Sequence, residues 1–333
     1  MIYLHFVGLA VLLTVCFGDV GDFSPCKSFF YQSTPPVGIN GTPICQRYKN
    51  MFRFATLYDR QRRSPWFSAY IFSDATNEKA KTKVSWMYEP QLANGSADGN
   101  MIPFPNATME QNVVENQAVQ QDYKNSSFSR GHLNPSQHHR DQQDRDATFT
   151  LTNIVPQRAE FNNGPWNVLE DTVKKRLIKY CKGPAYIITG IIPYKTERWI
   201  KNRVAIPEYL WSAYCCPDYS SNESISNKFP TFAAIGCNDN QTTIEMDNGT
   251  VSNSQKVYNV KPIPLDKLEE HLIERFGTEV RLFKNQCSTA VDEAASNSSL
   301  VVIIGIIVIT AIIIIVVVSV IAFKKKKADY HVV

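Results

Sequence analysis

The chain ends in a long apolar run at residues 300–323, which carries no charged side chain and consists mainly of isoleucine and valine. At about 1.5 Å per residue, a helix of this length extends roughly 36 Å and can cross a bilayer with some tilt. Four lysines follow at 324–327, and basic residues concentrate on the cytoplasmic side of membrane helices. We therefore expect a transmembrane helix at 300–323 and a basic cytoplasmic tail at 324–333, with the folded part before them.

The opposite end of the chain also begins with an apolar segment. Residues 1–18 contain FVGLAVLLTVCFG with small residues near its end, which is typical of a cleaved signal peptide. Residues 19–288 then form an ectodomain, and the polar stretch 289–299 forms a stalk. This arrangement predicts a single-pass type I membrane protein of the secretory pathway or cell surface, with its folded domain lumenal or extracellular.

Glycosylation signals agree with this topology. Sequons of the form Asn-x-Ser/Thr, which receive sugar only in the secretory pathway, all precede the apolar run. They begin at Asn40, Asn94, Asn106, Asn125, Asn222, Asn240, Asn248 and Asn297.

The ectodomain carries seven cysteines, and an oxidising compartment favours their pairing as disulfides. We expect Cys26 and Cys45 to form a local bridge. Cys215 and Cys216 are expected to reach different partners, because neighbouring side chains on a strand point to opposite faces. The odd number predicts that one cysteine stays reduced or pairs with a second chain in a homodimer.

No repeat, Pro-rich linker or charged hinge divides the ectodomain, so we expect one α+β domain. Segments rich in aromatic and β-branched residues, bounded by turn formers, predict a mostly antiparallel sheet with packed helices. These predicted strands lie at 52–59, 66–73, 83–89, 147–153, 185–192, 203–215 and 231–238. The Asn-, Gln- and Ser-rich segment 94–127 is expected to be a surface loop with at most one short helix.

Two motifs in the ectodomain carry candidate chemistry: SRGHLNP at 129–135 and TNIVPQRAEFNNGPWNVLE at 152–170. The imidazole of His132 titrates near neutral pH and can take a proton from water. Asn162 and Glu170 offer hard oxygen ligands of the kind that Mg²⁺ accepts while keeping most of its waters. Apolar periodicity predicts a helix over 166–181 with Pro165 at its first position, which places Asn162 at the frayed start, about 80° from Glu170 around the axis.

This pattern resembles the DNA/RNA non-specific endonucleases. Their ββα-metal motif reads D-R-G-H, then N-x-x-P-Q, then a metal-binding Asn nine positions after the first Asn and a Glu eight further on. The residues at those offsets here are Asn153, Pro156, Gln157, Asn162 and Glu170. The likeness to the endonuclease domain-containing 1 group of this family extends over roughly residues 23–288. It implies a ββα-metal active site within the α+β domain.

The resemblance also implies roles for the motif residues. Asn162 and Glu170 would hold Mg²⁺ or Mn²⁺, with Glu170 fixing its water shell, while His132 deprotonates the attacking water and Arg130 stabilises charge. Asn153 is expected to hold the motif loop or to touch substrate. Ser129 stands where the family has Asp, a departure that bears on activity more than on fold.

Simpler roles compete with these. His132 alone could be a structural histidine, Asn162 could cap the helix, and Glu170 could pair with Lys174 across one helical turn. His138 and His139 lie beside the motif, but adjacent side chains diverge and no further ligand stands at zinc spacing.

The small net charge of the ectodomain argues against strong binding of nucleic acid over its whole surface. The formal +4 falls to about +1 when the tail, with four lysines and one aspartate, is removed, whereas strong nucleic-acid binders carry a basic field. Any binding groove is therefore a local patch of cations, each of which could instead be a solvated surface residue. Candidates are Arg60, Arg62, Arg63, Arg130, Arg140, Arg145, Arg158, Lys174, Lys175 and Arg176.

The sequence leaves three functions open. The first is a membrane-anchored, metal-dependent nuclease that hydrolyses DNA and/or RNA through phosphate contacts. The second is a nuclease fold that binds nucleic acid or a protein partner without turnover, for which Ser129 is the reason. The third is an adhesion or signalling ectodomain that uses the fold as a scaffold.

Overall fold

The computed structural model describes residues 19–73, 84–220, 228–239 and 259–288 of the 333-residue chain. The folded unit ends at Cys287. The predicted signal peptide (1–18), stalk (289–299), transmembrane helix (300–323) and tail (324–333) lie outside the described residues. Within the described ranges, no helix combines the length and apolarity needed to cross a membrane.

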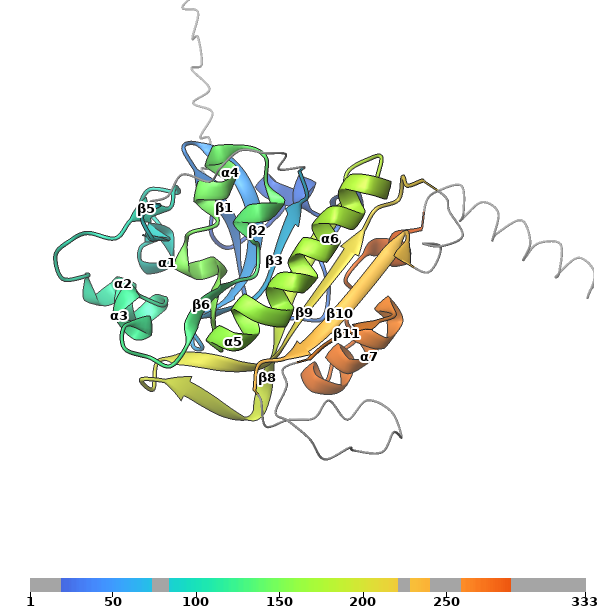
Figure 1. The fold of residues 1–333 in the computed structure, drawn as a ribbon. Helices are drawn as coiled ribbons and strands as arrows, with labels where there is room; N and C mark the ends of the chain where they lie inside the picture. The colour runs from blue at the N-terminus through green and yellow to red at the C-terminus, as the bar shows by residue number, and fades with distance from the viewer. Residues whose placement is uncertain (1–18, 74–83, 221–227, 240–258, 289–333) are drawn as a thin grey trace, which may run out of the picture. The chain divides into compact units, whose positions relative to one another are not determined.

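A seven-stranded antiparallel sheet forms the centre of the fold, in the order β1-β2-β3-β8-β9-β10-β11 (Figure 1). Its strands are β1 (Thr42–Tyr48), β2 (Met51–Asp59), β3 (Ser64–Ile71), β8 (Tyr186–Ile200), β9 (Val204–Cys215), β10 (Thr231–Cys237) and β11 (Val260–Ile263). Because β3 pairs directly with β8, the segment between them is an excursion from the sheet, and it carries both motifs. The predicted α+β class with a mostly antiparallel sheet is confirmed.

Most predicted strands are confirmed, but two are not. The segment predicted at 83–89 is reduced to β4 (Met87–Tyr88), which pairs with β5 (Ile102–Pro103). The strand predicted at 147–153 is wrong, because this segment contains the end of helix α4 (Gln142–Ala147) and the 3₁₀ turn η4 (Leu151–Asn153). Its apolar side chains are buried from a turn, and the strand β7 (Ile154–Gln157) starts only after it.

Two longer helices pack on the sheet (Figure 1). Helix α6 (Asn167–Tyr180) buries Leu169, Val173 and Leu177 in the same core cluster as the strands. Helix α7 (Leu265–Phe276) contacts β10 and places the ring of Phe276 5.3 Å from that of Trp66.

Shorter elements complete the described chain. The segment 94–127 holds two short helices, α2 and α3, where at most one was expected. The remaining elements are α1 (Pro90–Ala93), α2 (Gln111–Asn116), α3 (Gln120–Tyr123), α5 (Ala159–Phe161), β6 (Ser129–His132), η1 (Ser24–Phe29), η2 (Tyr31–Ser33), η3 (Ser136–His138), η5 (Asn162–Trp166) and η7 (Lys284–Cys287).

The described cysteines pair as the sequence predicts, and the described sequons lie at the surface. Asn40, Asn94, Asn106 and Asn125 are exposed, and the other four sequons lie outside the described residues. Three disulfides join Cys26 to Cys45, Cys181 to Cys216, and Cys215 to Cys287, which confirms the local bridge and the separate partners of the adjacent pair. The buried Cys237 keeps its thiol, which donates to the carbonyl oxygen of Asp239 at 3.2 Å. These disulfides indicate an extracellular or lumenal protein.

Candidate functional site

The two motifs meet in a small antiparallel ribbon. Strand β6 carries Ser129 through His132, and it pairs with β7 so that Ser129 lies opposite Gln157 and His132 opposite Ile154. Helix α5 starts at Ala159, directly after β7. The chain therefore builds a strand–strand–helix unit from segments that are far apart in sequence.

Asn153 holds this unit together. Its side chain is fully buried, and its Oδ1 accepts hydrogen bonds from the Ser68 hydroxyl and the Asn134 amide, both at 2.9 Å. Its Nδ2 donates to the carbonyl oxygens of Asn134 and Thr148, each at 3.0 Å. The amide thus ties the loop after His132 to strand β3 and to the end of α4. This geometry matches the loop-holding role rather than substrate contact.

His132 sits between two aromatic rings. Its imidazole centroid lies 5.0 Å from that of Phe149 and 5.8 Å from that of Trp86. Its Nε2 is buried and has no hydrogen-bond partner among the described residues. Burial lowers the pKa of His132 from 6.5 to about 4, because the charged form loses its hydration. The imidazole is therefore neutral at physiological pH, the state in which it can accept a proton.

Arg130 points its guanidinium at aromatic faces. The group lies 4.9 Å from the centre of Trp86 and 5.8 Å from that of Tyr123. Its Nε is buried without a hydrogen bond, and no carboxylate in the described part of the chain pairs with it. Burial lowers the pKa of Arg130, but a guanidinium keeps its charge in proteins. A half-buried cation without a counterion is suited to binding an anion such as phosphate.

Ser129 makes a different contact from any that a carboxylate could make. Its hydroxyl donates to the backbone carbonyl of Gln157 at 2.9 Å. The side chain of Gln157 packs under Gly131, where an added Cβ would lie 2.0 Å from Gln157 Oε1, so only glycine fits. Both polar atoms of that amide are buried without hydrogen bonds in the described chain.

Asn162 and Glu170 lie on one helical stretch that is less regular than expected. Helical structure starts at Ala159, earlier than Pro165, and passes through the π-helical turn η5 before α6 begins. The wider turn arises around Pro165 and the non-helical Gly164, so the 80° separation of a regular α-helix does not hold. Asn162 is partly exposed at this turn.

The carboxylate of Glu170 is oriented by Gln137, which follows the first motif in the sequence. Its Oε2 accepts a hydrogen bond of 2.7 Å from Gln137 Nε2. Burial raises the pKa of Glu170 from 4.5 to about 7, and the bond from Gln137 lowers it in part. Lys174 does not pair with it in the described structure; in the same helix Lys175 pairs with Asp171 at 2.6 Å.

The two histidines after the motif have structural partners. His138 Nε2 donates to the backbone carbonyl of Glu170 at 3.0 Å, so its Nδ1 accepts from the Tyr70 hydroxyl at 2.9 Å. His139 Nε2 lies 2.6 Å from Asn134 Oδ1. Among the described residues, no three His, Cys, Asp or Glu side chains gather in a way that could hold a metal ion.

Several of the predicted cations serve the fold. Arg62 pairs with Asp59 and Glu197, and Arg60 and Arg63 donate to backbone carbonyls. Arg145 is buried, and Arg176 lies 4.3 Å from the centre of the Phe232 ring. Near the motif, Arg158 covers the ring of Phe128 at 4.3 Å.

A pocket of about 670 Å³ opens next to the motif strand β6. Its walls come from the strand itself, from the segment around α3, and from Trp86. The lining residues are Trp86, Gln120, Gln121, Tyr123, Lys124, Phe128, Ser129 and Arg130. This pocket could not be predicted from the sequence, because its residues come from three separate segments: the predicted strand at 83–89, the expected loop at 94–127 and the start of the first motif.

Comparison with known proteins places this site in a family. A family model described as DNA/RNA non-specific endonuclease matches residues 35–270. The endonuclease domain-containing 1 protein of Homo sapiens is 33% identical over 60% of this chain and 40% of its own length. Mitochondrial endonuclease G of Homo sapiens is 33% identical over 38% of this chain and 46% of its own.

A solved structure aligns as well, that of the EndoG/EndoGI complex, with a TM-score of 0.45 and 20% identity, covering 70% of this chain and 84% of that one. Each curated relative named above is matched over less than half of its length. The family model, however, spans both motifs, the ribbon that they form and all seven strands of the central sheet. The chain belongs to the DNA/RNA non-specific endonuclease family.

Proposed function

We propose that this protein is a metal-dependent endonuclease that hydrolyses phosphodiester bonds of DNA and/or RNA. The observation that carries the proposal is the presence, on one short strand, of a neutral imidazole whose Nε2 is buried and of a guanidinium that has no counterion among the described residues. His132 can take a proton, and Arg130 can hold a phosphate oxygen. Both stand in the motif by which the chain matches its family.

Asn162 and Glu170 fit a divalent metal of the Mg²⁺ or Mn²⁺ type. Both offer oxygen atoms, both are partly exposed, and Mg²⁺ accepts one or two protein ligands besides water and substrate phosphate. Glu170 already has an orienting partner in Gln137. With a neutral amide as one ligand, the free protein would hold the metal loosely. When bound, the metal would supply charge neutralisation at the reacting phosphate.

The residues of this chain would then divide the work. His132 would accept the proton of the attacking water, with its ring fixed by Trp86 and Phe149. Arg130 would bind a phosphate oxygen, and Asn153 would keep the loop after His132 in place. Recognition through phosphates predicts low sequence preference.

The decisive experiment is plasmid nicking by the full-length chain with added Mg²⁺ or Mn²⁺. We expect His132→Ala to lower the rate by about 10² to 10⁴, as for other general bases. His271→Ala is the matched control, because His271 lies on α7, outside the site. Equal rates for the wild type and His132→Ala would rule out His132 as the general base.

We also propose that the enzyme is anchored as a type I membrane protein, with its nuclease domain lumenal or extracellular. The three disulfides and four exposed sequons support that side of the membrane. The apolar run at 300–323 and the lysines at 324–327 support the anchor and its orientation.

A second candidate is a binding protein without turnover. It is favoured by Ser129, whose hydroxyl is engaged by the Gln157 carbonyl where the family has a carboxylate. Purified protein that binds nucleic acid in an anisotropy titration, but never cuts plasmid in the nicking assay at any metal concentration, would establish this alternative.

A further inference from the structure

The pocket beside β6 has two chemically distinct parts. The aromatic residues Trp86, Tyr123 and Phe128 line it, and so do the two amide residues Gln120 and Gln121. Trp86 and Phe128 are partly exposed, and Tyr123 is buried. The guanidinium of Arg158 covers one face of the Phe128 ring, so a base would stack on the opposite face. Its volume of about 670 Å³ falls within the range of roughly 300 to 1,000 Å³ typical of small-molecule sites.

Two cationic residues also line the same pocket. Arg130 lines it with a guanidinium that lacks a counterion in the described chain, and Lys124 lines it from an exposed position. Aromatic rings, amide donors and acceptors and two cations therefore line one pocket, and they suit the three parts of a nucleotide: a flat base, its polar edge and its phosphate.

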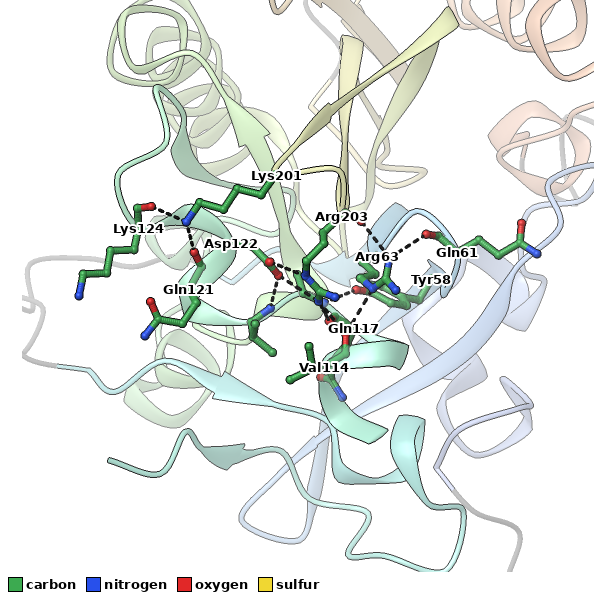
Figure 2. A network of polar contacts seen from close by, with 12 residues as sticks. Tyr58, Gln61, Arg63, Val114, Gln117, Gln121, Asp122, Lys124, Lys201 and Arg203 are labelled. Carbon is green, nitrogen blue, oxygen red and sulfur yellow. Dashed lines mark hydrogen bonds and ion pairs between the residues drawn. The ribbon is translucent and has the colours of Figure 1, made fainter. Parts of the chain in front are cut away.

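A polar network joins α3, which contributes lining residues to the pocket, to the turn between β8 and β9 (Figure 2). Buried Asp122 pairs with Arg203 at 2.7 Å, and Arg203 also donates to the Val114 carbonyl at 2.6 Å. Lys201 donates to the backbone carbonyls of Gln121 and Lys124. The turn between β8 and β9 thereby fixes the backbone of the pocket wall, so the pocket is formed before any ligand arrives.

We propose that this pocket is a nucleobase subsite, which holds one unpaired base of a single-stranded nucleic acid while Arg130 holds an adjoining phosphate. The inference rests on the proposed nuclease function and adds a substrate class to it. A base in a duplex must leave its stack to enter such a pocket, at a cost of a few kcal/mol. Bases of single strands and of unpaired regions enter the pocket without this cost.

The test measures binding separately from cleavage. Full-length protein with His132→Ala, which leaves substrate intact, is titrated into fluorescein-labelled oligothymidine and, separately, into a labelled blunt-ended duplex without a loop, with anisotropy as the readout. We expect tighter binding of the single strand. Phe128→Ala should weaken single-strand binding by about five- to hundredfold, the effect of losing one base–aromatic contact, and change duplex binding by less than about twofold.

Two further substitutions keep the result interpretable. Phe104→Ala is the matched control, because Phe104 is also a partly exposed aromatic residue of the same cluster but does not line the pocket. Phe128→Leu keeps apolar volume and removes only the ring, so it serves if Phe128→Ala fails to fold. Phe128→Tyr should retain single-strand binding.

The outcomes separate this inference from the nuclease proposal. Equal binding of both probes, no binding of either, or equal weakening of both by Phe128→Ala would overturn the subsite, even if the wild type cuts plasmid. Conversely, Phe128-dependent preference for the single strand would uphold it in a protein that never cuts.

Discussion

At the scale of single residues, the charge state of each motif group follows from what buries it. His132 loses proton affinity because aromatic rings replace water around it, and Glu170 gains proton affinity for the same reason. The two shifts move in opposite directions because one group is charged when protonated and the other when deprotonated. Neither pKa shift can be predicted from the motifs alone. For His132, for example, Trp86 and Phe149 lie outside both motif segments, 129–135 and 152–170.

Ser129 offers a direct test of the motif position at which this chain departs from its family. We expect Ser129→Asp to raise the nicking rate by about tenfold without changing metal dependence, because a carboxylate near the motif favours the protonated imidazole that forms during water attack. An aspartate cannot donate to the Gln157 carbonyl as Ser129 does, so its side chain must turn away from that oxygen.

Plasmid nicking across a Mg²⁺ titration measures this effect. Ser129→Ala is the control, because it removes the hydroxyl without adding charge. If Ser129→Asp cuts no faster at any metal concentration, this position does not limit the site.

Glu89 provides a stability prediction independent of the site. It is buried, accepts hydrogen bonds from Thr150 and Thr152, and burial raises its pKa from 4.5 to about 8. The folded state therefore keeps a proton that the unfolded state loses above about pH 4.5. The stability from this group is complete below that pH and is lost as pH rises through about 8.

We expect the free energy of unfolding to fall between pH 6.5 and 8 by up to about 1.4 kcal/mol per pH unit in the wild type. Glu89→Gln should remove that part of the slope, because a neutral amide does not titrate. Urea unfolding at several pH values measures the difference between the two proteins. Parallel slopes would show that Glu89 is charged in the folded state.

At the scale of elements, the network behind the pocket joins the β8–β9 turn to α3. Asp122 is almost fully buried and Arg203 is 25% exposed in this pair. We expect Arg203→Met to lower the free energy of unfolding by about 2 to 3 kcal/mol, because it leaves a buried carboxylate without its cation. Arg203 is partly exposed, so the cost lies at the lower end of values for buried pairs.

Lys267→Met gives the comparison for this prediction. Lys267 pairs with Glu270 at 2.8 Å, but both side chains are more than half exposed, and such pairs contribute under about 1 kcal/mol. Denaturant unfolding should therefore separate the two variants clearly. Equal losses would mean that the Arg203 pair is as weak as a surface bridge.

Prediction of elements from the sequence succeeded where burial and periodicity agree. Strands β2, β3, β8, β9 and β10 follow runs of aromatic and β-branched residues, and helix α6 follows apolar spacing. The segment 147–153 has the composition of a strand, yet the buried amide of Asn153 bonds the loop and stabilises a turn instead. That set of hydrogen bonds joins distant residues, so no local pattern reveals it.

Helix α7 is absent from the elements predicted above, although the sequence carries a helical pattern there. Leu265, Leu268 and Leu272 recur at helical spacing and are buried, and Gly277 ends the helix with φ of 70°. In the site, the π-helical turn η5 could not be predicted, because a regular helix start at Pro165 satisfies the same local rules. The pocket beside β6 depends on the tertiary packing of three segments, so no local pattern predicts it either.

At the scale of the whole molecule, the topology can be tested directly. We expect glycosidase treatment to increase the gel mobility of protein made in secretory cells, since four sequons are exposed on the folded domain. An antibody against residues 324–333 should stain cells only after permeabilisation, because the lysines at 324–327 favour a cytoplasmic tail. Staining of intact cells by that antibody would reverse the proposed orientation.

The bridge between Cys215 and Cys287 has a consequence for the release of this protein from a surface. A protease that cuts the backbone anywhere between Cys216 and Cys287 produces two fragments that stay covalently joined, because the bridge spans the cut. The apolar run at 300–323 belongs to the downstream fragment. If residues 300–323 anchor the protein as proposed, release of the intact folded domain requires a cut beyond Cys287, and a molecule cut between Cys216 and Cys287 keeps its covalent link to the anchor until this bond is reduced.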